Sequence, residues 1–342
     1  FEDYYTALGV ELKRLSQPIE LDTLYLGGGT PSHLGPEGIR HLFDVLHDVL
    51  RPTSAAEVTI EANPLDVSEA AIEAFRRCGI NRVSLGVQSL NALTLSTLDR
   101  DHREDDVRRV MPLLLNSGFT VSVDLIIAAP EQTLDAVGRD LEAITSLGAQ
   151  HVSVYCLTWE QGTAFWGKRA RGTLTPVAED VEHEMFELAI DQLSSSGYQQ
   201  YEVSNFAQSG MACRHNEAYW DCQPWEAFGP GAARFDGQNR ITNIRSTSVW
   251  MKNLIGGKGV TGDVDAMTTE GAARERLVLG LRRRRGVGRT SFFQQSGFQV
   301  DDLAKKPIQE WVAAGFAEDD GEHVRLTRSG MLLSDSLWSA VL

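Results

Sequence analysis

The sequence predicts an α/β fold organised around a parallel sheet or barrel. Between residues 21 and 157, five apolar strand-like segments alternate with amphipathic helical segments. Their spacing of roughly 30 to 40 residues is typical of βα units. The strands are almost continuously apolar, as strands covered on both faces are. Polar residues recur where these strands end, which is the edge at which barrels of this kind gather their site residues.

Composition and charge indicate a globular chain with a large core. The 342 residues are 42% hydrophobic and 23% charged, which fits one large domain with a smaller one. The net charge of −15 argues against a nucleic-acid-binding surface. No apolar run approaches the ~20 residues of a membrane span. The four cysteines are too scattered for a disulfide framework, so we expect a cytoplasmic protein in a reducing setting.

Local signals set the bounds of the predicted elements in the first half of the chain. Pro36 opens one helix, and Ser68 is an N-cap for a helix that Gly79 ends. Thr133 starts a later helix, whereas Pro112 is an unusual residue inside another. The strands are expected at 21–26, 57–61, 82–87, 120–127 and 151–157, and the helices at 2–16, 36–50, 68–78, 91–98, 104–116 and 133–148.

The alternation loosens beyond residue 160. A helix is expected at 178–195, a strand at 199–206 and a glycine-rich linker at 256–263. Three short helical patterns then lead to a strand at His323, which predicts a small C-terminal α+β domain of winged-helix type. Because the chain is so acidic, we expect no DNA binding there, and the basic run Arg282–Arg285 is expected to complement a helix end or to stay solvated. The predicted parts are 1–206, 207–262 and 263–342.

The segment Leu24–Ser32 joins an apolar strand to a helix through three consecutive glycines. Such residues let the backbone approach a ligand and expose N–H groups at the C-terminal end of a strand. A tight βα turn would use glycines as well, and the residues alone leave both interpretations open. The other polar residues at strand ends could each be a cap or a turn residue, but their recurrence favours a shared site. These residues are Thr30, Glu61, Gln88, Asp124 and Thr158.

Six motifs, taken in order, resemble the radical S-adenosylmethionine family around oxygen-independent coproporphyrinogen III oxidase. The last two point to the haem-chaperone (HemW) branch of that family. The resemblance covers nearly the whole chain and implies a partial (β/α)6 TIM-like barrel that holds S-adenosylmethionine and a [4Fe–4S] cluster. The motifs are Gly27–Ser32, Thr59–Pro64, Ser84–Ser89, Val123–Ile126, Tyr201–Ala207 and His215–Trp220.

The resemblance implies that the glycine turn binds the methionyl end of S-adenosylmethionine. Gly28, Gly29 and Thr30 match positions that offer backbone and hydroxyl groups to the ammonium and carboxylate of the cofactor. A side chain at the glycines would clash with such a ligand. The segment Tyr155–Leu157 would pass beside the adenine.

Four further side chains complete the S-adenosylmethionine site that the resemblance implies. Glu61 and Gln88 match positions that hydrogen-bond the nucleoside and methionyl parts. Arg100, twelve residues after Gln88, matches a guanidinium that pairs with the methionyl carboxylate. Asp124 matches a carboxylate near the ribose hydroxyls.

The family's cluster cysteines, spaced C-x3-C-x2-C, do not occur in this sequence. In the family they fall shortly before the helix that residues 1–15 match, so we expect the first barrel strand and the cluster loop upstream of Phe1. The remaining cysteines are badly spaced for cluster ligands. No metal ligand is therefore assigned within this chain.

The string His215-Asn-Glu-Ala-Tyr-Trp220 is the candidate haem-binding segment. Imidazole is a good axial haem ligand, and Tyr219 and Trp220 supply flat apolar surface for a porphyrin. From the residues alone, a capped turn with aromatic side chains packed on the barrel is the more ordinary interpretation. The resemblance favours haem, because this string belongs to the chaperone branch and not to the oxidase.

These observations predict a haem chaperone that binds haem or a porphyrin and passes it to acceptor haemoproteins. The alternative is an enzyme that decarboxylates coproporphyrinogen III oxidatively to protoporphyrinogen IX, so enzymatic activity stays open. A third interpretation, a phosphate-binding barrel enzyme, explains the glycines but not the other matched side chains. A homodimer and a peripheral membrane contact are further arrangements left open for the chaperone.

Overall fold

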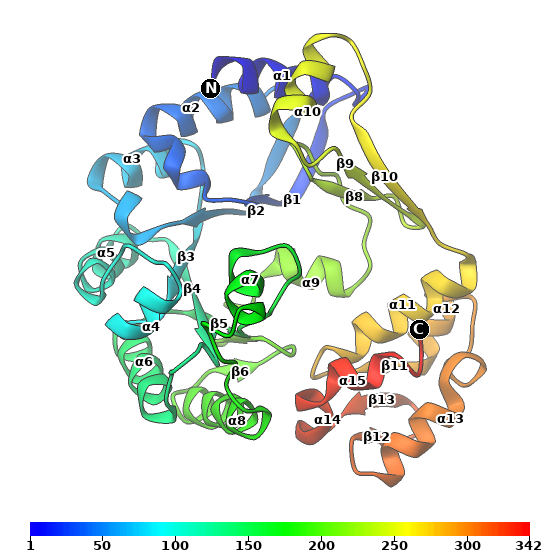
Figure 1. Cartoon of the computed structure of the whole chain (residues 1–342). Coiled ribbons are helices and arrows are strands. Elements are labelled where there is room, and N and C mark those ends of the chain that lie inside the picture. The colour runs from blue at the N-terminus through cyan, green and yellow to red at the C-terminus, as the bar shows by residue number, and fades with distance from the viewer. The chain divides into compact units, whose positions relative to one another are not determined.

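The computed structural model describes residues 1–342, apart from the side chain of Ala164. Its largest sheet has seven strands in the order β1–β2–β3–β4–β5–β7–β6 (Figure 1). Neighbouring strands from β2 to β5 pair in parallel, whereas β7 pairs antiparallel with both β5 and β6. The strands are β1 (Ile19–Leu26), β2 (Leu50–Ala62), β3 (Arg82–Gln88), β4 (Thr120–Ile127), β5 (His151–Cys156), β6 (Gln199–Gln200) and β7 (Asn205–Ala207).

Helices connect these strands, and α3, α5 and α6 lie along one side of β3–β5 in Figure 1. Two short 3₁₀ helices, η1 (Pro31–Leu34) and η2 (Pro64–Asp66), follow β1 and β2. The predicted α/β class with a parallel sheet is confirmed. The helices are α1 (Glu2–Leu12), α2 (Gly35–Leu46), α3 (Glu69–Arg77), α4 (Ala92–Thr97), α5 (Glu104–Asn116), α6 (Leu134–Ser146), α7 (Ala164–Ala170) and α8 (Glu179–Ser195).

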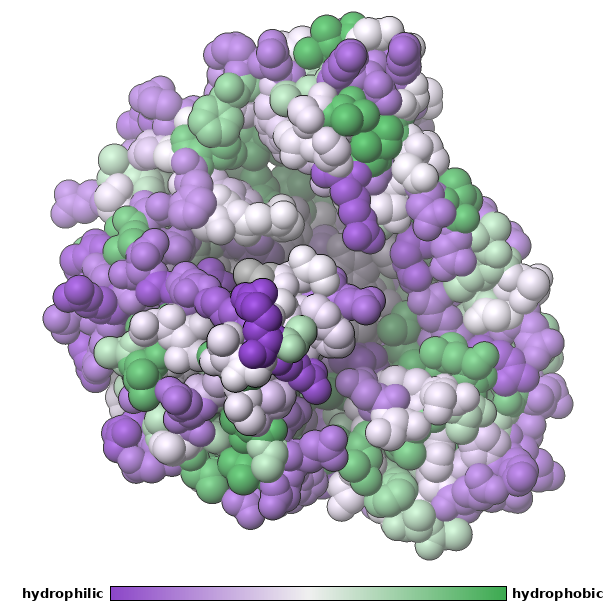
Figure 2. Space-filling model, viewed as in Figure 1, coloured by the Kyte–Doolittle hydropathy of each residue, from purple (hydrophilic) through white to green (hydrophobic). Residues whose placement is uncertain are grey.

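The core lies between the parallel strands and their helices. Consecutive residues are buried on β3 (82–85) and on β4 (121–123), which confirms that these strands are covered on both faces. The helices contribute single apolar stripes, such as the Val107–Leu114 face of α5. Figure 2 shows hydrophilic residues gathered over α5, as expected for the solvated side of an amphipathic helix.

The chain forms two compact units. The barrel unit contains Tyr25–Ile39 and Glu57–Cys213, and the terminal unit contains Phe1–Leu24, Arg40–Ala56 and Arg214–Leu342. The predicted parts 1–206, 207–262 and 263–342 are drawn along the sequence, whereas in the terminal unit α1 packs against α10 (Thr247–Ile255).

The terminal unit contains two small antiparallel sheets, ordered β10–β9–β8 and β11–β13–β12. In the second sheet β11 follows α11, and β12 and β13 follow α12 and α13, so the predicted C-terminal α+β domain is confirmed. The elements after residue 213 are α9 (Arg214–Trp220), β8 (Ala233–Phe235), β9 (Asn239–Asn243), α10 (Thr247–Ile255), β10 (Thr261–Ala266), α11 (Thr269–Leu281), β11 (Val287–Gly288), α12 (Arg289–Ser296), α13 (Val300–Ala313), β12 (Ala317–Asp319), β13 (His323–Leu326), α14 (Arg328–Leu332) and α15 (Ser334–Trp338).

Two predicted elements are wrong in detail. The strand expected at 199–206 is a pair of short strands, because the buried Glu202 carboxylate accepts hydrogen bonds from the Ser204 N–H and the Asn205 amide and so forms a turn. The linker expected at 256–263 ends inside β10, which pairs with β9. Every residue of β10 is exposed, so its sequence carries no alternating pattern. Among the described residues, no helix is both long and apolar enough to span a lipid bilayer.

Candidate functional site

The carboxyl ends of the parallel strands bring two predicted carboxylates together in the barrel unit. Glu61 is the next-to-last residue of β2 and pairs in register with Ser84 of β3. The Ser84 hydroxyl donates to Asp124 on β4, at 3.0 Å from Oδ2. On the side of β1, the Tyr25 hydroxyl donates to Glu61 Oε1 over 3.1 Å. Parallel pairing thus places Glu61 and Asp124 at the carboxyl ends of their strands, and the hydrogen bond from Tyr25 adds a third side chain. We call Tyr25, Glu61 and Asp124 the strand-end cluster.

Desolvation holds both carboxylates of the strand-end cluster closer to neutrality than usual. Desolvation raises the pKa of Glu61, and the negative charge of Asp124 raises it further, against hydrogen bonds from Tyr25 and the amides of Gly28 and Gly29. Desolvation also raises the pKa of Asp124, against hydrogen bonds from serine hydroxyls. Two desolvated carboxylates with raised pKa values favour a ligand that carries positive charge, such as an ammonium or a sulfonium.

The glycine turn after β1 is shaped around Glu61. A Cβ atom at Gly27 would lie 2.6 Å from both Glu61 Oε1 and the Tyr25 ring, so a side chain there would displace one of these groups. Gly28 has a φ of +82°, whereas a Cβ at Gly29 would meet open space. Sequence reasoning selected Gly28, Gly29 and Thr30 and missed Gly27, whose need for glycine depends on a strand 34 residues away (Gly27 to Glu61).

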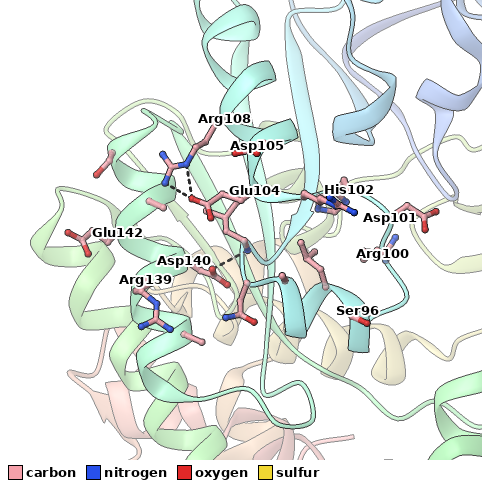
Figure 3. A pocket seen from close by; sticks show the side chains of 18 residues that line it. Ser96, Arg100, Asp101, His102, Glu104, Asp105, Arg108, Arg139, Asp140 and Glu142 are labelled. Atoms are coloured by element: carbon pink, nitrogen blue, oxygen red, sulfur yellow. Dashed lines mark hydrogen bonds and ion pairs between the residues drawn. The ribbon is translucent and has the colours of Figure 1, made fainter.

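Gln88 ends β3 at the same edge, and its backbone φ is +63°. Its register partner is Leu125, the residue after Asp124. Arg100 is exposed and lines an open pocket of about 1140 Å³ beside α5 and α6 (Figure 3). No hydrogen bond among the described residues connects its guanidinium to Glu61 or Asp124. The structure therefore brings Gly28, Gly29, Glu61, Gln88 and Asp124 to one strand edge, and places Arg100 in the loop after α4.

The described residues do not fit an iron–sulfur cluster. Cys78 and Cys156 are half-buried, and Cys213 and Cys222 are buried. The Cys213 thiol donates to Glu57 Oε1 over 3.4 Å, and burial raises the pKa of Cys222, which disfavours the thiolate that a metal needs. Within the described part of the chain, no three His, Cys, Asp or Glu side chains group as a metal site.

The candidate haem segment forms α9, in the terminal unit. Both ring nitrogens of His215 are engaged: Nδ1 lies 2.9 Å from Thr23 Oγ1, and Nε2 lies 3.0 Å from the Tyr219 hydroxyl. His215 and Tyr219 are four residues apart, so one turn of α9 brings their side chains together. Tyr219 also meets Trp225 edge to face, with ring centroids 4.6 Å apart. Thr23 could not be found from the sequence, because it lies far from the motif along the chain.

The end of α9 is held by the basic run Arg282–Arg285. The Arg282 guanidinium lies 5.0 Å from the centre of the Trp220 ring. Asp221 forms ion pairs with Arg283 and with Arg285. The run follows the C-terminal end of α11, which agrees with the first of its two expected roles, whereas the Arg283 side chain is only 11% exposed and so is not solvated.

Comparisons with known proteins cover the whole chain. The radical SAM superfamily model matches residues 8–144, and the HemN C-terminal domain model matches residues 267–333. The heme chaperone HemW of Bacillus subtilis is 33% identical, across 100% of this chain and 91% of that protein. The heme chaperone HemW of Mycobacterium tuberculosis H37Rv is 32% identical, across 98% of this chain and 85% of that protein.

A mitochondrial protein and a solved structure are also similar to this chain. Mouse radical S-adenosyl methionine domain-containing protein 1, mitochondrial, is 32% identical, across 97% of this chain and 78% of that protein. Among solved structures, the coproporphyrinogen III oxidase HemN of Escherichia coli matches with a TM-score of 0.87 over 99% of this chain and 82% of that chain. Its identity is 20%, so this likeness concerns the fold.

Proposed function

Because the chain belongs to the HemW family of radical S-adenosylmethionine proteins, we propose that it binds haem and delivers it to haemoproteins in the cytoplasm. The observation that carries this proposal is the similarity to haem chaperones over the full length of the chain. The aromatic surroundings of His215 on α9 support it further, since a flat apolar surface beside an imidazole suits a porphyrin.

We propose that His215 binds the haem iron through Nε2. The Thr23 hydroxyl can accept a hydrogen bond from Nδ1–H, and this tautomer leaves a lone pair on Nε2. A fixed partner on the other ring nitrogen is the usual way in which a histidine ligand is oriented. In this tautomer the Tyr219 hydroxyl donates to Nε2, at 3.0 Å, so haem binding would exchange that hydrogen bond for a bond to iron.

The strand-end cluster fits S-adenosylmethionine. Glu61 and Asp124, whose pKa values are raised, would accept the positively charged groups of the cofactor. The glycine turn leaves room for its methionyl end, since Gly28 and Gly29 have no atoms within 4 Å of a Cβ position. Tyr155 at the end of β5 is 43% exposed and offers a ring face for adenine. S-adenosylmethionine would supply a sulfonium to this edge, and we propose that it regulates haem transfer or dimerisation.

The proposal is tested with the purified chain under anaerobic conditions. One sample receives haem, and the other receives coproporphyrinogen III with S-adenosylmethionine. We expect a stable haem absorption spectrum that His215→Ala abolishes. His183→Ala is the matched control, because that surface histidine on α8 is 45% exposed and should leave the spectrum unchanged.

Two results would contradict this function. Unchanged haem binding in His215→Ala would remove His215 as the ligand. Formation of protoporphyrinogen IX in the second sample would replace the chaperone by the oxidase.

A further inference from the structure

The backbone at Gln88 makes a tight turn that a side-chain-bearing residue rarely adopts. The Ser89 N–H donates to the Val87 carbonyl over 2.7 Å, and Gln88 between them has a φ of +63°. This is a γ-turn of the rare, strained type. The register between β3 and β4 shifts between Leu85 and Gln88 as well. Strain of this kind persists only where surrounding groups hold it, and it concentrates at functional sites.

His102 holds the turn from its N-terminal side. Its side chain is buried, with 1% exposed, and Nε2 lies 2.8 Å from the Val87 carbonyl. A carbonyl can only accept, so the proton is on Nε2. Desolvation lowers the pKa of His102, so the ring is neutral and keeps this tautomer. Nδ1 is buried and has no hydrogen-bond partner among the described residues, which leaves the bond to Val87 as the polar contact of the ring.

Asp140 of α6 holds the turn from its C-terminal side. Its carboxylate is buried, with 5% exposed. Oδ2 accepts from the Ser89 hydroxyl over 2.5 Å, and Oδ1 accepts from the Leu90 N–H over 3.0 Å. The Ser89 oxygen in turn accepts from the Asn91 N–H, and Asn91 caps α4. Figure 3 shows Asp140 and His102 on separate elements, with a dashed line at Asp140 for its bond from the backbone.

We propose that His102 and Asp140 are positioning residues for Gln88 in the S-adenosylmethionine site. They fix the backbone on the two sides of Gln88. They therefore fix the point at the strand edge from which the Gln88 side chain extends. The register partner of Gln88 directly follows Asp124, so a displaced turn would move the carboxamide relative to the strand-end cluster. A site group that is held before the ligand arrives costs less to order on binding. This positioning role rests on the proposed cofactor role of Gln88.

The test uses a matched pair of variants at position 102. His102→Gln can present an amide N–H near the place of Nε2, whereas His102→Leu has similar bulk and no donor. Binding of S-adenosylmethionine to the purified chain is measured by calorimetry, and folding by thermal melting. We expect His102→Leu to weaken binding about tenfold, the size of one lost hydrogen bond to an ordered group. His102→Gln should retain affinity within about threefold.

A cycle with Gln88→Ala separates positioning from a general loss of stability. In the Gln88→Ala background, His102→Leu should cause no further loss of affinity, because the group that it positions is gone. Additive losses, or a lower melting temperature with unchanged affinity, would overturn the positioning role. Ser89→Ala repeats the test from the Asp140 side if His102→Leu does not fold.

The remaining outcomes distinguish this role from the proposed function. If the wild type binds no S-adenosylmethionine, or if Gln88→Ala binds as the wild type does, the cofactor role of Gln88 fails and the positioning role with it. Haem titration of the same variants should match the wild type. Loss of haem binding in the wild type itself would instead refute the chaperone function.

Discussion

The strand-end cluster and α9 differ in how far each is shaped before its proposed ligand binds. At the strand ends the backbone is already shaped: a side chain at Gly27 would displace Glu61 or Tyr25, and Gly28 and Gln88 have positive φ values. On α9 no residue is fully buried, and both nitrogens of His215 are bound to hydroxyl groups of the protein itself. For the proposed ligands, the first region is therefore shaped before binding, whereas the second would have to exchange a hydrogen bond of His215 for the bond to iron.

The largest effect is expected from a methyl group added at Gly27, where the glycine turn lies against Glu61. In Gly27→Ala the new Cβ would lie 2.6 Å from Glu61 Oε1 and from the Tyr25 ring, so Glu61 must move. We expect S-adenosylmethionine affinity to fall about 100-fold and the free energy of unfolding to fall by about 1–3 kcal/mol, as overpacking does. Calorimetry and chemical denaturation measure the two quantities.

Gly29→Ala is the matched control for stability. Its Cβ would meet open space and its φ is not in the left-handed region, so its free energy of unfolding should lie within about 0.5 kcal/mol of the wild type. If Gly27→Ala is as stable as Gly29→Ala and binds normally, the turn is not shaped around Glu61.

Asp124→Asn should separate binding from stability. Since the pKa of Asp124 is raised on folding, the folded state holds the proton more tightly than the unfolded chain. Wild-type stability therefore falls as pH rises from the ordinary aspartate value near 3.9 through the raised value. The Asn variant lacks this loss, so it should be the more stable protein at pH 7, while its S-adenosylmethionine affinity falls about tenfold. Denaturation at pH 4 and 7 measures the difference, and a less stable Asn variant at pH 7 would refute the buried carboxylate as the cause.

The sequence predicted much of the region at the strand ends because its signals are local. Apolar strands, a glycine turn and polar residues at strand ends are adjacent in the chain, and they led to Glu61, Gln88 and Asp124. What it missed is held by distant partners. Gly27 requires glycine because Glu61 lies beside it, and the network of His102 and Asp140 joins residues up to 51 positions apart.

The sequence predicted less of α9 for the same reason. The string His215–Trp220 could be found, but His215 contacts Thr23, 192 residues away, and the adjoining Asp221 contacts Arg283, 62 residues away. The polar strand β10 was missed because exposure on both faces removes the alternation that marks a strand.

A pair of variants tests whether α9 must exchange a contact to bind haem. Tyr219→Phe removes the hydroxyl that occupies Nε2 of His215 and keeps the ring, so haem affinity should rise about threefold. Thr23→Val removes the partner of Nδ1, so haem affinity should fall about three- to tenfold. Haem titration followed by absorbance measures both. Equal losses in the two variants would mean that Tyr219 supports haem instead of competing with it.

The smallest effect is expected from Asp221→Asn. This variant tests whether the ion pairs after α9 help to position His215 or only anchor the helix. The variant keeps the shape of the side chain and leaves Arg283, 11% exposed, without its carboxylate. Asp221 is itself 34% exposed, so solvent screening limits the loss of stability to about 1 kcal/mol, seen as a melting temperature lower by about 2 °C. Asp135→Asn, which breaks the exposed pair with Arg139, should change the melting temperature less.

Because Asp221 contacts neither nitrogen of His215, haem affinity in Asp221→Asn should change less than about threefold. A loss as large as that of Thr23→Val would show that the basic run positions the haem ligand, and α9 would then resemble the strand ends in being prepared before its ligand arrives.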